Sequence, residues 1–322
     1  MTSFGNVFSI PLFTMLICPI IVAVSSPARA DLVPSIKFQD DFKGVERSMP
    51  DGSRKLYPDT EKWAFTFWPG TKWPDSYGDG TNWLNGNAEC QTYLSALIGK
   101  VKGQAVPLNL RYDPFSIEDD GLHIKAAALS KEQMAAYQVE GPRRFGSGIL
   151  MSRQSFKYGR ITVVARLPSA RGSWPAFWLL PESHEWPPEI DVFEGMAWGP
   201  HSRQIRSGLL GSEEKDQTSS QWFDLGVDPS KDFHEYALDW NAETISMSFD
   251  GKTLWTRPTP CLMHQNMYML ANLAVGGKWP YNELGVNPVD GMSRERLMIG
   301  SDLIAGDYPA EMIIKSISVA AD

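Results

Sequence analysis

Short runs in which apolar and polar residues alternate, or in which β-branched residues dominate, recur along the chain. A period of two is typical of strands with one buried side. Turn-forming pairs lie between the runs, and Asp250-Gly251 joins Thr244–Phe249 to Lys252–Trp255 in the pattern of a β-hairpin. The pattern predicts strands over Gly121–Ala126, Arg160–Leu167, Glu235–Trp240, Thr244–Phe249 and Met312–Val319.

A helical pattern is confined to Ser130–Gln138, where Ser130 and Gln133 have the spacing of an N-terminal capping box. Many short strands with turn signals between them are typical of an all-β sandwich or barrel. No internal repeat or linker divides the chain, so we expect a single domain.

The N-terminal segment has a different composition from the rest. Residues 7–24 are almost all apolar, and Ala28-Arg29-Ala30 has the small-x-small pattern of a cleavage site. We interpret residues 1–30 as a signal peptide and 31–322 as the mature domain, secreted or periplasmic and free of the membrane after cleavage. The alternative is an uncleaved anchor, but the run is short for a span and contains Pro11 and Pro19.

Composition excludes two classes of protein. The formal net charge of −8 lacks the basic excess that nucleic-acid binders use, and a mean hydropathy of −0.26 excludes a multi-span membrane protein. Without the signal peptide two cysteines remain, Cys90 and Cys261, and the sequence does not decide whether they form a disulfide.

Aromatic residues gather in Phe67–Tyr93, among Gly, Pro, Asp and Asn. We interpret this segment as loops that roof a binding cleft, where aromatic faces stack on sugar rings; the alternative is an aromatic loop packed on itself. Its large aromatic members are Trp68, Trp73, Tyr77, Trp83 and Tyr93.

The candidate chemistry lies in Trp186-Pro-Pro-Glu189-Ile-Asp191-Val-Phe-Glu194. In a regular strand Glu189 and Asp191 share one face and Glu194 falls on the other. A one-residue bulge at Val192 or Phe193 would bring all three acids to one face. At ~3.3 Å per residue the two glutamate carboxyl groups would then lie roughly 5 Å apart, the spacing of a retaining glycosidase.

Acids crowded on one face have three explanations. They are a solvated surface, a cation site, or a catalytic group whose pKa values are shifted by mutual repulsion. The aromatic setting of Gly172–Pro181 and Trp186 favours catalysis, and Glu194 is followed by Gly195 instead of a basic partner.

The acid segment resembles the signature of the family 16 glycoside hydrolases in its bulged form, found in laminarinase-like and broader β-glucanases. Other similar stretches follow in the family's order across most of residues 38–319. They include Asn87-Ala-Glu-Cys-Gln-Thr-Tyr93, Gly172-Ser-Trp-Pro-Ala-Phe-Trp178, Phe233-His-Glu-Tyr-Ala-Leu-Asp-Trp240 and Asn272-Leu-Ala-Val-Gly-Gly-Lys-Trp-Pro280.

The resemblance implies a concanavalin-like β-jelly-roll sandwich of two curved antiparallel sheets. It implies a secreted retaining endo-β-glycosidase that acts on β-1,3- or β-1,3/1,4-glucan or a bacterial exopolysaccharide. Glu189 would be the nucleophile, Glu194 the general acid/base and Asp191 the acid between them. A lectin-like binding module on the same sandwich, or a transglycosylase that remodels exopolysaccharide, are the alternatives.

Four residues are expected to bind the polysaccharide: Trp174, Trp186, Asn87 and Trp279. We interpret Trp255 as peripheral to the sugar sites. For Trp178 the sequence leaves two positions open, the core and the cleft. We expect a monomer without a cofactor and without nucleic-acid partners.

The sequence departs from the family pattern in two places. The strand after the acid segment, Gln204–Leu210, has no His where many bulged relatives carry one, and His201 lies in a predicted turn. The last strand has Lys315 where many relatives place a calcium-binding Asp. Because an ammonium group cannot bind Ca²⁺, we expect no metal there.

Overall fold

The computed structural model describes residues 35–65, 87–139, 141, 143–183, 185–211, 219–285 and 300–321. The predicted signal peptide lies outside these residues, as does most of Phe67–Tyr93. Within the described part, no helix has the length and apolar character needed to cross a membrane.

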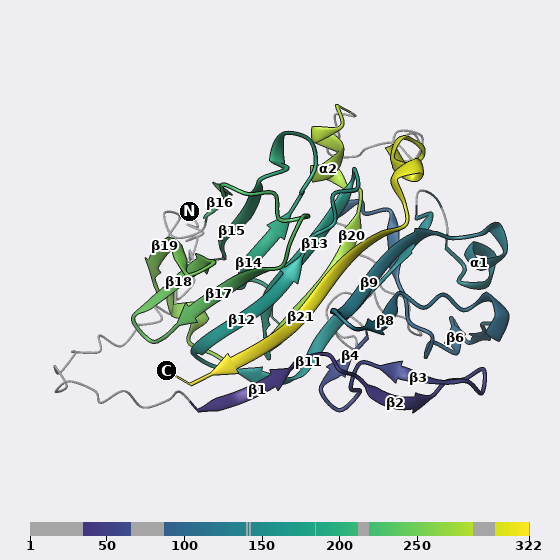
Figure 1. Ribbon diagram of the computed structural model, residues 1–322, viewed down its shortest axis with the longest axis horizontal. Coiled ribbons are helices and arrows are strands. Elements are labelled where there is room, and N and C mark those ends of the chain that lie inside the picture. The colour runs from purple at the N-terminus through teal and green to yellow at the C-terminus, as the bar shows by residue number, and fades with distance from the viewer. Residues whose placement is uncertain are drawn as a thin grey trace, which may run out of the picture. The chain divides into compact units, whose positions relative to one another are not determined.

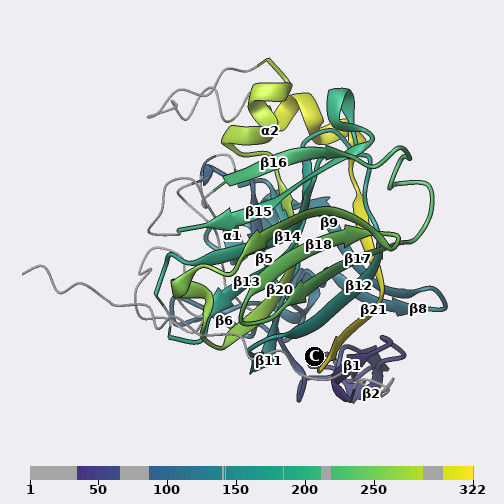
Figure 2. The same ribbon diagram turned by 90° about the vertical axis from the view of Figure 1, so that its left-hand side faces the viewer.

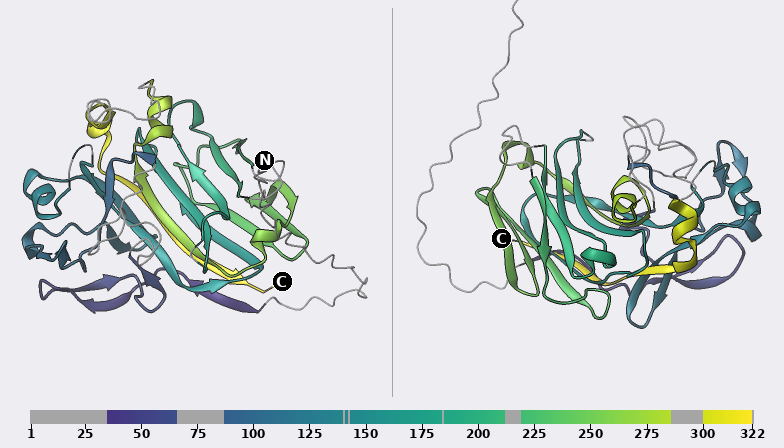
Figure 3. Two further views of the ribbon diagram at one scale, coloured as in Figure 1. Left: turned by 180° about the vertical axis from the view of Figure 1, so that it is seen from behind. Right: turned by 90° about the horizontal axis from the view of Figure 1, so that it is seen from above.

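Two sheets within the unit Pro34–Asp322 form a β-sandwich (Figures 1 and 3). The larger has ten strands and pairs antiparallel except between β5 and β10. Its path is β19 (Lys252–Pro258), β18 (Thr244–Phe249), β17 (His234–Trp240), β12 (Gly159–Arg166), β21 (Ala310–Ala320), β9 (Gly121–Ala128), β10 (Phe145–Ser147) and β5 (Gln91–Tyr93), with β1 (Ile36–Asp40) on β21 and β8 (Phe115–Glu118) on β9.

The smaller sheet has seven antiparallel strands, which follow one another from β16 towards β11 in Figure 2. Its order is β16 (Ser219–Asp224), β15 (Gln204–Leu210), β14 (Glu189–Gly195), β13 (Ser173–Pro181), β20 (Met267–Val275), β11 (Ile149–Phe156) and β4 (Trp63–Ala64).

The remaining elements are short. Two hairpins pair β2 (Val45–Ser48) with β3 (Arg54–Tyr57) and β6 (Lys100–Val101) with β7 (Gln104–Ala105). Helices in the described part include α1 (Lys131–Ala136) and α2 (Lys278–Glu283), and residues 300–304 are also helical. Short 3-10 turns lie at Leu108–Leu110, Gly199–His201, Cys261–Met263 and Ala305–Asp307.

The five predicted strands are all present, and β18 and β19 form the predicted hairpin. Its turn residues Asp250 and Gly251 both have positive φ, 46° and 75°, as a tight hairpin turn requires. Ser130 caps α1 with Gln133 in a capping box, also as predicted. Helix α2 was not predicted, because its Gly-Gly-Lys-Trp-Pro start has the composition of a loop.

The core fills the space between the sheets. Alternate residues of β12 and β17, such as Val163 and Leu238, pack in one cluster with Phe177 and Ile190 of the smaller sheet. A second cluster lies on the other face of the smaller sheet and includes Trp178. Glu194 and Asp191 lie on this same face, because they pair across the sheet with Ala176 and Trp178 of the outer cluster.

Cys90 is a free, buried thiol, so it forms no disulfide with Cys261. Its Sγ contacts the Tyr281 hydroxyl and accepts a hydrogen bond from the Ser301 hydroxyl at 3.2 Å. Cys90 therefore ties the segment before β5 to α2 by polar contacts instead of a covalent bond.

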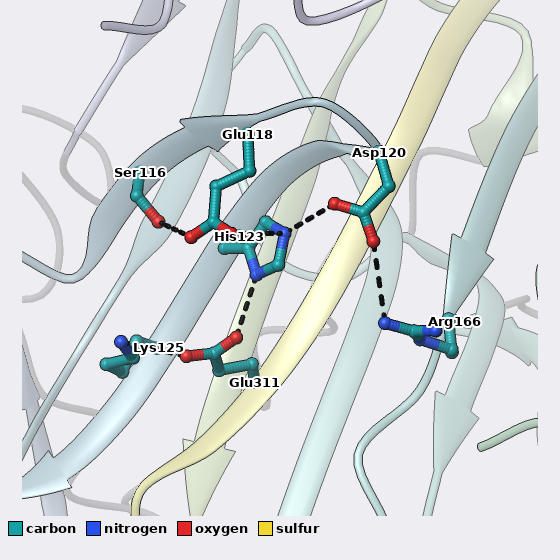
Figure 4. Close-up of polar contacts among 7 residues, drawn as sticks. All are labelled: Ser116, Glu118, Asp120, His123, Lys125, Arg166 and Glu311. Atoms are coloured by element: carbon teal, nitrogen blue, oxygen red, sulfur yellow. Dashed lines mark hydrogen bonds and ion pairs between the residues drawn. The ribbon is translucent and has the colours of Figure 1, made fainter. Parts of the chain in front are cut away.

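His123 on β9 forms an ion cluster on the outer surface of the larger sheet (Figure 4). Its Nδ1 lies 2.7 Å from Glu311 and its Nε2 lies 2.7 Å from Asp120, with Glu118 at 3.7 Å. Ionised carboxylates only accept hydrogen bonds, so the protonated imidazole, which donates from both ring nitrogens, is the form that these acids stabilise. Its hydrogen bonds to these acids raise the pKa of His123, although burial opposes them as the largest single effect.

Glu118, Asp120 and His123 are the group of described side chains whose ligand atoms lie close enough together to hold a metal. A histidine ligand must offer a lone pair to the metal, and here both nitrogens are engaged with carboxylates. We therefore assign this cluster as an ion-pair network. Lys315, on the neighbouring strand β21, places its ammonium 5.7 Å from the centre of the Phe233 ring.

We predict that His123 makes stability depend on pH. Its folded pKa lies above the unfolded value of about 6.5. The stabilisation is therefore complete below that value and is lost as pH rises through the folded pKa. Thermal melts between pH 5 and 9 should show the Tm advantage of wild type over His123→Gln shrinking by about 2 °C or more.

His264→Gln is the control for this measurement, because His264 pairs with the neutral Tyr158 hydroxyl at 2.6 Å. Its Tm difference from wild type should not follow the same trend. A pH-independent difference for His123→Gln would show that the imidazole acts by packing and not by charge.

Candidate active site

A β-bulge in β14 puts three acids on the outer face of the smaller sheet. Against β13, Trp178 pairs with Asp191 and Phe177 with Phe193, so Val192 is the extra residue. Against β15 the register shifts between Asp191 and Glu194. Val192 and Phe193 both pack in the core, and the predicted bulge is confirmed.

Glu189 opens the strand and is half-buried. Its Oε2 accepts a hydrogen bond of 2.7 Å from the Trp186 indole N–H. Burial raises the pKa of Glu189, while hydrogen bonds from Asp191 and Trp186 oppose the rise. Trp186 is 55% exposed, so one edge of its indole binds the acid while much of the ring stays open to solvent.

Asp191 is the most enclosed of the three, with 2% of its surface exposed. Its pKa is raised well above the ordinary value, first by burial and then by the charges of Glu189 and Glu194. Asp191 and Glu189 share a hydrogen bond, which two carboxyl groups can form only if one is protonated. The directions of the two effects favour Asp191 as the member of the pair that keeps the proton.

Glu194 ends the acid segment, and its Oε1 accepts a hydrogen bond of 3.1 Å from the Trp174 indole N–H. The pKa of Glu194 is raised to about 7, by burial and then by the charge of Glu189, while Arg206 and Trp174 oppose the rise. A carboxyl group with this pKa exchanges a proton near neutral pH, as a general acid/base must.

A row of rings extends from Glu194 to the edge of the sheet. The rings of Trp174 and Trp279 meet edge to face with their centres 5.1 Å apart, and the centres of the Trp279 and Trp222 rings are 5.0 Å apart. Trp222 stacks on His201 at 3.6 Å. His201 also contacts Glu283 of α2 at 3.2 Å, so it stands at the far end of the row and not beside Glu194.

The segment before β5 approaches the same place. The Asn87 side chain donates to Glu89 at 3.0 Å, and Glu89 is 2% exposed. Gly277 has φ +103°, and a Cβ there would lie 2.9 Å from the Asn87 carbonyl oxygen and 3.5 Å from Trp174. A glycine is therefore required for this close approach.

The structure thus groups Trp174, Trp279 and Asn87 near Glu194 and puts Trp186 beside Glu189. Among the aromatic loop residues, Tyr93 is described and fully buried, with its hydroxyl accepting from Asn272 at 2.9 Å. The other four, Trp68, Trp73, Tyr77 and Trp83, lie outside the described residues.

Trp178 and Trp255 are both buried in the described structure. Trp178 belongs to the buried outer cluster and donates to Asn272 at 2.7 Å. Trp255, interpreted as peripheral to the sugar sites, lies in the core between the sheets, where it is 6% exposed and its indole N–H donates to Ser207 at 2.9 Å. Its position on β19, paired with Met247, turns the ring into the core.

Sequence reasoning missed Glu89, Arg206 and Trp222. Glu89 lies within a stretch that carried the family resemblance, so that stretch was an available signal. Arg206 and Trp222 have no local signal, since they reach the site only through the pairing of β14, β15 and β16.

A family model for the glycosyl hydrolases family 16 matches residues 112–282. The chain belongs to glycoside hydrolase family 16. Two relatives from Rhizobium meliloti (strain 1021), the endo-1,3-1,4-beta-glycanases EglC and ExsH, are 31% and 32% identical over 88% and 90% of this chain. The chain covers 52% and 53% of these relatives, about half of their length.

A beta-glucanase from Rhodothermus marinus is 29% identical, with 72% of this chain and 75% of the relative covered. Among solved structures, the laminarinase catalytic domain of Thermotoga maritima has a TM-score of 0.60 at 21% identity, covering 90% of this chain and 98% of that one. The endo-beta-1,3(4)-glucanase SCLam has a TM-score of 0.62 at 21% identity, covering 92% and 94%. The predicted jelly-roll fold is thus confirmed.

We predict that Asp191→Asn stabilises this family 16 domain. The pKa of Asp191 is higher in the folded protein than the value of about 3.9 in the unfolded chain. The folded state therefore loses stability as pH rises from about 3.9 towards the folded pKa. Asparagine keeps a donor for Glu189 and does not ionise. Thermal melts at pH 8 should show a Tm about 2 °C or more above wild type, with the gap closing towards pH 4.

Asp40→Asn is the matched control, because Asp40 is a buried carboxylate that accepts from Trp63 Nε1 at 2.8 Å and from the Phe42 N–H at 2.9 Å. This variant should lower the Tm. A Tm for Asp191→Asn below wild type at pH 8 would mean that Asp191 is ionised and held by attraction.

Proposed function

We propose that the protein is a retaining endo-β-glycanase that hydrolyses internal bonds of a β-glucan. The observation that carries the proposal is the bulged strand, which presents Glu189 and Glu194 on one face with Asp191 between them. The printed names of the family relatives, endo-1,3-1,4-beta-glycanase and beta-glucanase, support the choice of substrate class.

In the first step Glu189 attacks the anomeric carbon while Glu194 gives its proton to the glycosidic oxygen. The C–O bond breaks, and its electron pair stays on the leaving oxygen, which takes that proton. The Trp186 N–H and the Asp191 proton hold the Glu189 carboxylate in place. A pKa of about 7 keeps Glu194 protonated at the start.

In the second step the oxygen of a water molecule attacks the anomeric carbon, and the bond between that carbon and the Glu189 carboxylate oxygen breaks. Glu194, now a carboxylate, takes a proton from the water, and Glu189 leaves as the carboxylate. Asp191 contributes by remaining neutral throughout, since a further negative charge beside Glu189 would raise the energy of the free carboxylate.

The proposal also covers the linkage of the glucan and the export of the protein. The substrate is a β-1,3- or mixed-linkage β-1,3/1,4-glucan, with a bacterial exopolysaccharide as the third candidate. We also propose export to the periplasm or the medium, on the basis of the apolar run at residues 7–24 and Ala28-Arg29-Ala30. Product analysis on laminarin, lichenan and an acidic exopolysaccharide, and N-terminal sequencing of the exported protein, test these two points.

We predict that Glu189→Gln and Glu194→Gln each reduce glucan hydrolysis about 100-fold or more. Each change removes a reacting group but keeps side-chain volume, so the Tm should stay close to wild type. Reducing-sugar release measures turnover, and NMR of the first-formed anomer should show retention. An inverted anomer would contradict the double displacement.

The same assays separate the alternative functions. A binding module would bind glucan without releasing reducing ends from wild type. A transglycosylase would give products longer than the starting oligosaccharide. Near wild-type turnover in either glutamine variant would remove that residue from its proposed role.

We predict that Trp186→Ala lowers kcat/KM about tenfold, because the exposed indole provides a flat face for a sugar ring beside Glu189. Trp186→Phe keeps an aromatic face but loses the N–H, so its loss should be smaller. Kinetics on lichenan and thermal melts measure both. A collapse of the Tm in Trp186→Ala would make Trp186 structural, and equal losses in the two variants would exclude stacking.

A further inference from the structure

Arg206 lies on β15 directly beside Glu194. The antiparallel register pairs Glu194 with Arg206, and Arg206 with Trp222 of β16. Residues paired across neighbouring strands project from the same face of a sheet, so these side chains form one row. The Arg206 guanidinium also lies over the Trp279 ring, 5.1 Å from its centre. Arg206 therefore lies next to the acids, with its guanidinium over the Trp279 ring.

Arg206 differs from other arginines of the described residues in its charge partners. Arg160 and Arg171 form direct ion pairs with carboxylates on the surface, whereas no ion pair of Arg206 is found within the described part of the chain. Arg206 is half-buried, where water screens its charge less than at the surface. The positive charge of Arg206 therefore acts on both Asp191 and Glu194.

The charge of the acid group moves towards Arg206 during the proposed first step. In the proposed mechanism Glu189 starts as the nucleophilic anion and Glu194 as the protonated acid, and the pKa of about 7 of Glu194 fits that role. When Glu189 bonds to the anomeric carbon and Glu194 gives its proton to the leaving oxygen, the negative charge passes to Glu194. A cation beside Glu194 stabilises this later state more than the starting state, which is the requirement for faster chemistry.

We propose that Arg206 is a positioning residue that stabilises the negative charge on Glu194 after Glu194 releases its proton. The inference rests on the proposed acid/base role of Glu194. Within the described residues, the charged groups on the elements around Glu194 include Glu189 and Asp191 on its own strand, Glu89 in the segment near Trp174, and the His201–Glu283 pair at the far end of the aromatic row. The direction of the Arg206 effect, which lowers the pKa of both Glu194 and Asp191, supports the proposal.

The test compares the pH dependence of kcat/KM on lichenan in wild type, Arg206→Gln and Arg206→Lys. Without the cation Glu194 holds its proton more tightly, so the alkaline limb should move up by about one pH unit in Arg206→Gln. The acid limb should stay in place, and Arg206→Lys should restore the wild-type alkaline limb. Arg203→Gln is the matched control, because Arg203 is exposed just before β15 and contacts the Gly226 carbonyl oxygen.

A second measurement follows Glu194 itself by ¹³C NMR titration of labelled carboxyl groups, with the resonance assigned by its loss in Glu194→Gln. In Arg206→Gln this titration should move to higher pH, and in Arg203→Gln it should not. An unmoved titration overturns the inference, as does a uniform fall in kcat/KM with both limbs fixed, which would indicate a structural or substrate-binding role.

The two measurements keep this inference separate from the proposed function. Turnover retained in Glu194→Gln removes the acid/base role, while the NMR titration still reports whether Arg206 acts on Glu194. Loss of turnover in Glu194→Gln with an unmoved titration in Arg206→Gln preserves the role of Glu194 and removes that of Arg206. A thermal melt of Arg206→Gln confirms that the variant is folded.

Discussion

The candidate site depends on one extra residue in strand β14. Without the bulge at Val192, the strand's period of two would turn Glu194 into a core filled by residues such as Phe193 and Phe177. A carboxylate buried among apolar side chains without a partner either becomes protonated or destabilises the fold. The destabilisation is about 3–5 kcal/mol when a buried charge has lost its partner. With the bulge, two apolar residues enter the core together and the acids keep one face. Fold stability and site geometry therefore satisfy the same constraint.

Acids held this closely on a buried strand need compensation, and the site provides it by different means. The indole N–H groups of Trp186 and Trp174 each bind one glutamate. Burial and the charges of the two glutamates raise the pKa of Asp191, which disfavours a third negative charge, and Arg206 supplies the opposite charge next to Glu194. The result is a pair of glutamates with different proton affinities, which is the asymmetry that an acid/base and a nucleophile require.

The opposite surface of the sandwich resolves a similar crowding of acids in another way. There His123 lies between Asp120 and Glu311, and in its protonated form it donates to both carboxylates and offsets their charge. Both groups contain three acids, but in the His123 network they form direct ion pairs with His123, Lys125 and Arg166 (Figure 4). In the candidate site the exposed indole of Trp186 lies beside Glu189 instead. Perturbed acids alone therefore do not identify an active site; their access to a ligand and their aromatic surroundings do.

The sequence by itself determined the features that depend on neighbouring residues. The alternation of Thr244–Phe249, the turn at Asp250-Gly251 and the cap at Ser130 are local, and the spacing of Glu189, Asp191 and Glu194 requires a bulge wherever they share a face. Only the tertiary structure decided that Cys90 stays free, that Trp255 is buried and that Arg206 lies beside Glu194. These depend on strand order and register, which are set by packing between segments far apart in the chain, so no local pattern of residues records them.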